Sequence, residues 1–142
     1  MHIQGTPRNM QHNPSYKALI PEIMDYLRES IESAHRAGID DSHIILDPGI
    51  GFGKSYLHNI VILNRLSEFS TLGYPLLIGV SRKAFLGKIL GNAPVSARLE
   101  ATIAAVVIAA YNGAQMVRIH DVQEIAKAVR VADAIRLERI TE

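Results

Sequence analysis

The sequence contains no cysteine and has no clear excess of either charge. Without cysteine the chain can form no disulfide, no reactive thiolate and no cysteine-based zinc site. With 15 basic and 14 acidic residues the formal net charge is only +1, whereas a general nucleic-acid-binding surface needs a marked basic excess. We therefore expect no nucleic-acid partner.

Long hydrophobic runs are also missing. The longest apolar run, within residues 101–111, is too short to cross a bilayer, and the first 13 residues lack the apolar core of a signal peptide. Apolar residues nevertheless make up 48% of the 142 residues, which is enough for a sizeable core. The simplest expectation is a cytoplasmic protein without membrane contact, folded as a single domain over residues 1–142.

Helical stretches alternate with short apolar segments along the chain. The apolar segments lie at 43–46, 76–79 and 115–119, and each follows a helical stretch that ends at a glycine. Alternation of this kind predicts an α/β fold in which helices connect parallel strands. We expect these segments to be the buried strands.

The last two predicted helices differ in pattern. Residues 99–111 are apolar almost all round, so a second covering element is needed, either a partner subunit or the chain's own neighbours. The final helix begins at Asp121, which with Glu124 forms a capping-box pattern. Its predicted buried stripe consists of Val122, Ile125, Val129, Ala132 and Ile135.

Polar side chains follow the predicted strands at their carboxyl ends. Asp47 follows the first, Lys83 follows the second, and Arg118 and His120 end the third. Ligands of parallel sheets bind beyond these ends, and residues two positions apart on a strand point to the same side. The pattern indicates a site for a polar, anionic ligand.

The glycine-rich stretch from Gly49 to Ser55 resembles a phosphate-binding P-loop but does not match it. The P-loop pattern needs a glycine where this chain has Pro48, and the dinucleotide pattern needs one where it has Lys54. We expect the glycines instead to supply positive φ angles and a close approach of backbone to a flat ligand.

Four short motifs follow one another along the chain: MHIQGTP at 1–7, DPGIGFGK at 47–54, SRKAF at 81–85 and RIHDV at 118–122. In this order and spacing they resemble the motifs of the dihydropteroate synthase family of pterin-binding enzymes. The resemblance implies a transferase of folate biosynthesis that is a sulfonamide target. Such enzymes condense 6-hydroxymethyl-7,8-dihydropterin pyrophosphate with p-aminobenzoate, giving 7,8-dihydropteroate and pyrophosphate.

The same resemblance implies the C-terminal half of a (β/α)8 TIM-type barrel, with parallel strands and alternating helices. The chain corresponds to the end of strand five through helix eight, whereas a whole barrel takes about 250 residues. An isolated half-barrel exposes unpaired strand edges. We therefore expect a homodimer or other self-association, or association with a missing N-terminal half.

The resemblance also implies roles for individual residues. Asp47 would hydrogen-bond the pterin ring, Gly79 would let the pterin approach the strand, and Met1 would line the pterin pocket. Phe52 would pack against the p-aminobenzoate ring. Ala84 stands where family members commonly have a serine that contacts the p-aminobenzoate carboxylate, a contact that a backbone N–H can replace.

Three residues are expected to be catalytic by the same resemblance. Lys83 would reach the pterin and the p-aminobenzoate side, and Arg118 and His120 would bind the pyrophosphate. The family implies Mg²⁺, but its ligands are not expected in this chain. Lys54 and Asn59 are expected to be structural or solvated, and surface roles are expected for the remaining histidines: His2, His12, His35, His43 and His58.

Two other functions remain open. A related barrel that handles methyltetrahydrofolate would not need the anion-binding residues at 81–83 and 118–120, so their presence disfavours it. The other alternative is a non-catalytic half-barrel that binds pterin or associates with itself.

Overall fold

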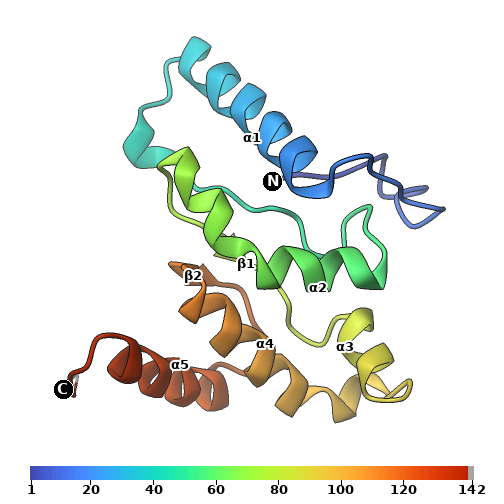
Figure 1. Ribbon diagram of the computed structural model, residues 1–142, viewed down its shortest axis with the longest axis vertical. Coiled ribbons are helices and arrows are strands. Elements are labelled where there is room, and N and C mark those ends of the chain that lie inside the picture. The colour runs from blue at the N-terminus through green and yellow to red at the C-terminus, as the bar shows by residue number, and fades with distance from the viewer. Residues whose placement is uncertain (141–142) are drawn as a thin grey trace.

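The computed structural model describes residues 1–140, in which helices alternate with short strands (Figure 1). The α-helices are α1 (Leu19–Arg36), α2 (Tyr56–Asn64), α3 (Ala84–Ile89), α4 (Leu99–Tyr111) and α5 (Val122–Arg136). The strands are β1 (Leu77–Ile78) and β2 (Met116–Val117). Short 3-10 helices are η1 (Asp41–His43), η2 (Leu66–Leu72) and η3 (Val95–Ala97).

The strands are parallel, as predicted. β1 pairs with β2 in a register that sets Leu77 against Met116. Leu46 forms a parallel bridge with Leu76, and the backbone N–H of His2 donates to the carbonyl of Asp47 at 2.9 Å. These contacts place the N-terminal segment, residues 44–47, β1 and β2 side by side, with α1 at one end of the molecule and α5 at the other (Figure 1).

The regular strands are shorter than the predicted apolar segments. At the first segment His43 belongs to η1, and only Leu46 makes a bridge. The α/β class with parallel strands and intervening helices is confirmed, whereas the predicted segments extend beyond the regular strands at both β1 and β2.

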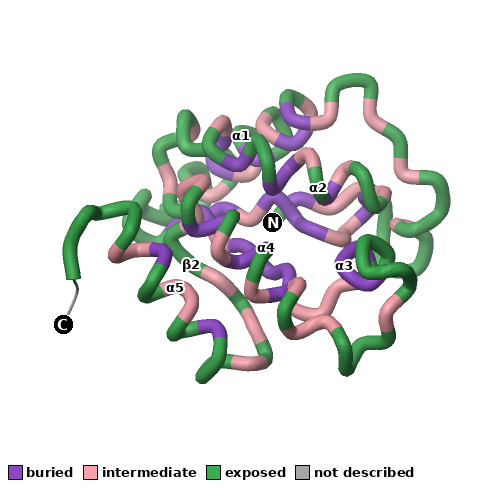
Figure 2. The backbone as a smooth tube through the Cα atoms, turned by 60° about the horizontal axis from the view of Figure 1, so that its bottom comes forward, coloured by how far each residue is buried: buried purple, intermediate pink, exposed green. Residues whose placement is uncertain are grey.

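The buried apolar residues form one cluster around these central segments (Figure 2). Helix α1 contributes Ile20, Ile23 and Leu27, whose spacing of three and four residues makes a single buried face. Phe69 of η2 and Ile78 of β1 are fully buried in the same cluster. The core thus fixes the strands from which the polar side chains of the next section project.

Helix α5 packs along α4, which supplies a cover from the chain's own neighbours for part of that apolar helix. Ile108 and Tyr111 of α4 still face solvent. The predicted stripe of α5 is only partly buried, because Ile125 and Ala132 are covered whereas Val122 and Ile135 are exposed.

Within residues 1–140, none of the helices is both long and apolar enough to cross a membrane.

Candidate functional site

The glycine-rich loop lies against the chain's own N-terminal segment. Gly49 and Gly53 have φ angles of 74° and 66°, in the left-handed region that disfavours other residues. A Cβ on Gly49 would lie 1.9 Å from the carbonyl oxygen of His2, and one on Gly53 would lie 2.4 Å from that of Gln4. Positive φ is confirmed, but at these two glycines the closely approaching group is protein backbone and not a flat ligand.

Asp47 stands at the start of this loop and forms its turn. Its Oδ1 accepts a hydrogen bond from the backbone N–H of Gly49 at 2.7 Å. Among residues 1–140, Oδ2 accepts no hydrogen bond from another protein group. The carboxylate also lies close enough to Lys54 and Lys83 to raise the pKa of each. Asp47 therefore has an acceptor oxygen available beside two cations.

Lys54 is buried beneath the loop, with only 3% of its surface exposed. Its Nζ donates to the carbonyl of Phe52 at 3.0 Å and lies 2.9 Å from Nδ1 of His2. Burial lowers the pKa of Lys54 to about 7, against an opposing effect of Asp47. Lys54 therefore ties the loop to the N-terminal segment, in agreement with a structural role.

The predicted surface role of His2 is wrong. Its side chain is buried and packs edge-on against Tyr26, with 4.9 Å between ring centroids. Burial, followed by the charge of Lys54, lowers the pKa of His2 to about 4. His2 cannot be recognised from sequence spacing, because its partner Lys54 is 52 residues away along the chain.

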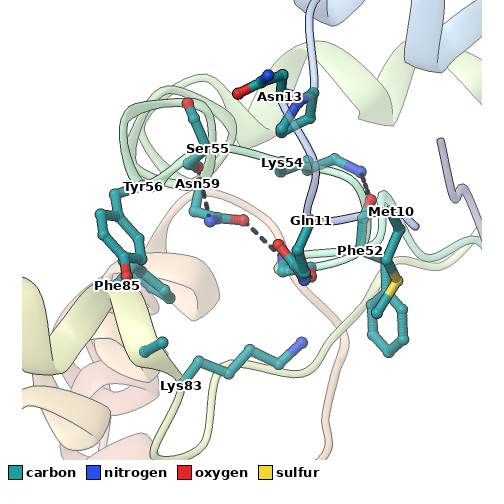
Figure 3. A pocket seen from close by; sticks show the side chains of 13 residues that line it. Met10, Gln11, Asn13, Phe52, Lys54, Ser55, Tyr56, Asn59, Lys83 and Phe85 are labelled. Atoms are coloured by element: carbon teal, nitrogen blue, oxygen red, sulfur yellow. Dashed lines mark hydrogen bonds between the residues drawn. The ribbon is translucent and has the colours of Figure 1, made fainter. Parts of the chain in front are cut away.

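Lys83 immediately precedes α3 and points into the site (Figure 3). Its Nζ donates to the carbonyl of Ile50 and lies 4.8 Å from the centroid of the Phe52 ring, in a cation–π contact. Burial lowers its pKa to about 8, Asp47 opposes this shift, and Arg118 lowers the pKa further. Lys83 is thus a partly desolvated cation within electrostatic range of the Asp47 carboxylate and the Arg118 guanidinium.

Arg118 and His120 follow β2 on the neighbouring strand. The Arg118 side chain lies over Gly79, where a Cβ would stand 3.5 Å from Nη2. His120 is exposed, and its Nδ1 lies 2.8 Å from Oγ of Ser81. The structure therefore brings Arg118 next to Gly79 and within electrostatic range of Lys83, and it anchors His120 to the end of β1.

Asp121 does not cap α5, although the sequence pattern predicts it. No side-chain capping bond forms at this helix start. The carboxylate instead accepts two hydrogen bonds from the Arg82 guanidinium, one from Nε at 3.0 Å and one from Nη2. A bidentate, charge-assisted pair is stronger than a single bond to a backbone N–H, so the ion pair is preferred. The pKa of Asp121 is lowered by this pairing.

A cavity of about 830 Å³ opens between the glycine-rich loop and the start of α3 (Figure 3). Phe52, Lys83 and Ala84 line it, so the structure brings these predicted residues together. Met1 is half exposed and does not line this cavity. The roles assigned to these residues, and to Asp47, Gly79, Arg118 and His120, stay predictions.

Two of the cavity residues that the sequence does not predict as part of the site bind the glycine-rich loop. Gln11 donates from Nε2 to the carbonyl of Gly51 at 2.6 Å, and the Asn59 Oδ1 accepts from the N–H of Gly51 at 2.7 Å. Both fix the glycine-rich loop from outside. Gln11 lies in an irregular segment whose position follows only from the tertiary fold, so the sequence carries no signal for it.

No group of three or more His, Asp or Glu side chains in residues 1–140 is arranged to hold a metal ion. The Mg²⁺ implied by the resemblance stays a prediction.

Comparison with known proteins places these features in a family. The model of the pterin binding enzyme family matches residues 1–120. Dihydropteroate synthase from Escherichia coli K12 is 45% identical over 134 residues, which cover 94% of this chain and 47% of the relative. The chain thus spans about half the length of the curated relatives it matches.

Solved structures agree with that comparison. A Yersinia pestis dihydropteroate synthase in complex with a sulfonamide drug superposes with a TM-score of 0.94 at 43% identity, covering 97% of this chain and 50% of the other. A Stenotrophomonas maltophilia dihydropteroate synthase with imidazole in its active site gives 0.92 at 37% identity, covering 99% of this chain and 52% of the other. Because the family model matches most of the length of this chain, this chain belongs to the pterin-binding enzyme family.

Proposed function

We propose that this chain is the C-terminal half of a (β/α)8 barrel with dihydropteroate synthase activity in folate biosynthesis. The observation that carries the proposal is the convergence of Asp47, Lys83 and Arg118 at the ends of adjacent parallel strands. Asp47 and Arg118 each lie within electrostatic range of Lys83. Relatives at 45% identity are named dihydropteroate synthases, and one solved relative holds a sulfonamide drug.

Asp47 and Phe52 would bind and orient the aromatic substrates. Asp47 Oδ2 is available to accept hydrogen bonds, and a carboxylate can accept from both the 2-amino group and a ring N–H of a pterin. Phe52 presents its ring to the cavity beside Lys83. An aminobenzoate stacked there would have its amine held near the pterin, and such positioning supplies much of the rate enhancement in a two-substrate reaction.

Arg118 and His120 would bind the leaving group. The amine nitrogen of p-aminobenzoate attacks the methylene carbon of the pterin, the C–O bond breaks, and its electron pair leaves with pyrophosphate while the amine loses a proton. Negative charge therefore builds on the pyrophosphate oxygens, where guanidinium and imidazole N–H donors stabilise it. A planar guanidinium suits a multidentate oxyanion.

The other half of the barrel is expected to come from further polypeptide or from a second copy. β2 has a strand neighbour, β1, on one side only, within residues 1–140. A groove of about 520 Å³ beside β2 is lined by Val117, Ile119 and Ile125. An unpaired strand edge with an apolar groove favours association. The cytoplasmic location, the homodimer and the Mg²⁺ requirement belong to this proposal.

The test is turnover by the 142-residue chain with dihydropterin pyrophosphate, p-aminobenzoate and Mg²⁺, followed by pyrophosphate release. Arg118→Ala should lower the rate by about 100-fold or more, since one oxyanion donor is worth that much. Arg28→Ala, on the outer face of α1, is the matched control and should keep the wild-type rate. Isothermal titration with inorganic pyrophosphate gives a second readout that does not need a complete site.

Saturable pyrophosphate binding that Arg118→Ala abolishes, without turnover, would make this chain the anion-binding part of a site completed elsewhere. Absence of both turnover and pyrophosphate binding would contradict the proposed roles of Arg118 and His120. Turnover that survives in Arg118→Ala would contradict them as well.

A further inference from the structure

Residues 81–83, between β1 and α3, connect to both halves of the candidate site. Ser81 contacts the His120 ring through Oγ, and Arg82 forms the bidentate ion pair with Asp121. Lys83 reaches the carbonyl of Ile50 across the cavity. The backbone conformation of this one segment therefore sets the direction of each of these side chains.

Arg82 has a φ of 56°, a left-handed conformation that non-glycine residues seldom adopt. Such a conformation persists only where the surroundings hold it in place. The backbone N–H and the backbone carbonyl of Arg82 are each held by a side chain, one from α4 and one from the residue just before that helix. The N–H donates to Oγ1 of Thr102 at 3.0 Å, and the carbonyl accepts from Nη1 of Arg98 at 2.9 Å.

Thr102 and Arg98 are themselves fixed. Thr102 is fully buried, and its hydroxyl donates to the carbonyl of Arg98 at 2.8 Å. The Arg98 Nε donates to the carbonyl of Ala93 at 2.9 Å, so its guanidinium spans two backbone carbonyls. The guanidinium occupies space that exists only because residue 87 is glycine, where a Cβ would lie 2.4 Å from Arg98 Nε.

We propose that Arg98 and Thr102 are positioning residues that hold Arg82 in its left-handed conformation, and thereby aim Ser81 at His120 and Lys83 at the cavity. Neither lines the cavity, so neither is a candidate for substrate contact. The consequence for catalysis rests on the proposed function, but the geometric effect on His120 does not.

The expected effect on His120 follows from its hydrogen bonds. Ser81 Oγ accepts from the backbone N–H of His120 at 3.2 Å and lies 2.8 Å from Nδ1. We assign the hydroxyl hydrogen to Nδ1, which makes Nδ1 an acceptor and leaves the proton of the neutral ring on Nε2. Nε2 becomes an N–H donor, which is the form an anion needs.

The test compares Thr102→Val with Thr102→Ser in the 142-residue chain. Valine keeps the shape but removes the acceptor for the Arg82 N–H, whereas serine keeps the hydroxyl. Thr71→Val removes an exposed threonine hydroxyl that bonds only a local carbonyl on η2 and is the matched control. The readouts are the ¹⁵N shifts of the His120 ring, identified with His120→Gln, and the affinity for inorganic pyrophosphate.

Thr102→Val should shift the His120 nitrogens toward a mixture of tautomers and weaken pyrophosphate binding by about tenfold, the loss of roughly one hydrogen bond. Thr102→Ser and Thr71→Val should retain wild-type values for both. In a Ser81→Ala background Thr102→Val should change the His120 nitrogens no further, because the two act through one contact.

A lower melting temperature in Thr102→Val with unchanged His120 nitrogens and unchanged pyrophosphate affinity would overturn the proposal, as would additive effects with Ser81→Ala. If Thr102→Val does not fold, Arg98→Lys decides, because one ammonium cannot span both carbonyls, and it should move the same signals. If the wild-type chain binds no pyrophosphate but Thr102→Val still moves the His120 nitrogens, the proposed function fails and the positioning role stands.

Discussion

The buried Lys54 should make the stability of this protein depend on pH in a way that one substitution removes. Its pKa is lowered by burial from 10.5 to about 7. Between these values the unfolded chain binds a proton that the folded chain does not, so the free energy of unfolding rises with pH. The slope for one such group is about 1.4 kcal/mol per pH unit.

Lys54→Met should therefore reduce the slope between pH 8 and 9.5 by about 1.4 kcal/mol per pH unit. The remaining slope comes largely from Lys83, whose pKa is lowered to about 8 by burial. Below pH 7 the variant should be the more stable protein, because the charged lysine is costly to bury, on the order of 5 kcal/mol for this shift. Near pH 9.5 the two proteins should differ by less than about 1 kcal/mol, because the small remaining cost of burying the lysine is then offset by its bond to the Phe52 carbonyl.

The assay is urea unfolding followed by circular dichroism at half-unit steps from pH 6 to pH 9.5. Lys88→Met, which removes an exposed lysine of α3, is the matched control and should follow the wild-type curve. The two stability curves of wild type and Lys54→Met should converge as the pH rises toward 9.5. Parallel curves would refute the argument, since they would mean that Lys54 titrates alike in the folded and unfolded chain.

Other substitutions test the loop, the core and a cap. In urea unfolding, Gly49→Ala should destabilise the protein more than Gly73→Ala. Both glycines have positive φ, but a Cβ at Gly49 would meet a backbone oxygen, whereas one at Gly73 would enter open space. Gly73→Ala should therefore cost only about 1–2 kcal/mol. Phe69→Ala, in the fully buried core, should cost about 3–5 kcal/mol, and Leu57→Ala, on the exposed side of α2, less than about 0.5 kcal/mol. Ser55→Ala should cost about 1 kcal/mol through loss of the bond to the backbone N–H of His58, with a matching fall in melting temperature.

Local patterns predicted the elements of the fold whose stability is local. On α1 the buried residues Ile20, Ile23, Leu27 and Ile31 recur at spacings of three and four, so the face that packs on the core can be recognised in the sequence. The stripe on α5 fails at Val122 and Ile135 because periodicity states which residues share a face and not how wide the covering element is. The predicted strands are too long for a related reason. Pairing of one strand ends where the neighbouring strand ends, and an apolar run in the sequence does not show where that is.

The motifs indicate candidate site residues, whose roles stay predictions, but they do not predict the contacts among those residues. Lys83 and Phe52 meet across a sequence distance that only the fold closes. At Asp121 a local and a distant partner compete for the same carboxylate. The helix-start pattern predicts a cap, but Arg82, 39 residues earlier, provides the stronger partner. The left-handed conformation of Arg82 carries no sequence signal, since arginine is not a residue that usually marks positive φ.

The electrostatics of the site agree with the anionic ligand that its residue types indicate. Lys83 lies among charged groups that include Asp47 and Arg118, and both burial and Arg118 disfavour its charged form. Cations held together in this way repel one another until a counter-charge arrives, and a bound oxyanion would remove that repulsion and favour the charged lysine. Such a group of cations binds most strongly to the species that carries the most negative charge. In the proposed reaction that species is the departing pyrophosphate. On the proposed function, this chain would therefore supply the part of the site that handles charge, and enclosure of the substrates would be left to the other half of the proposed barrel.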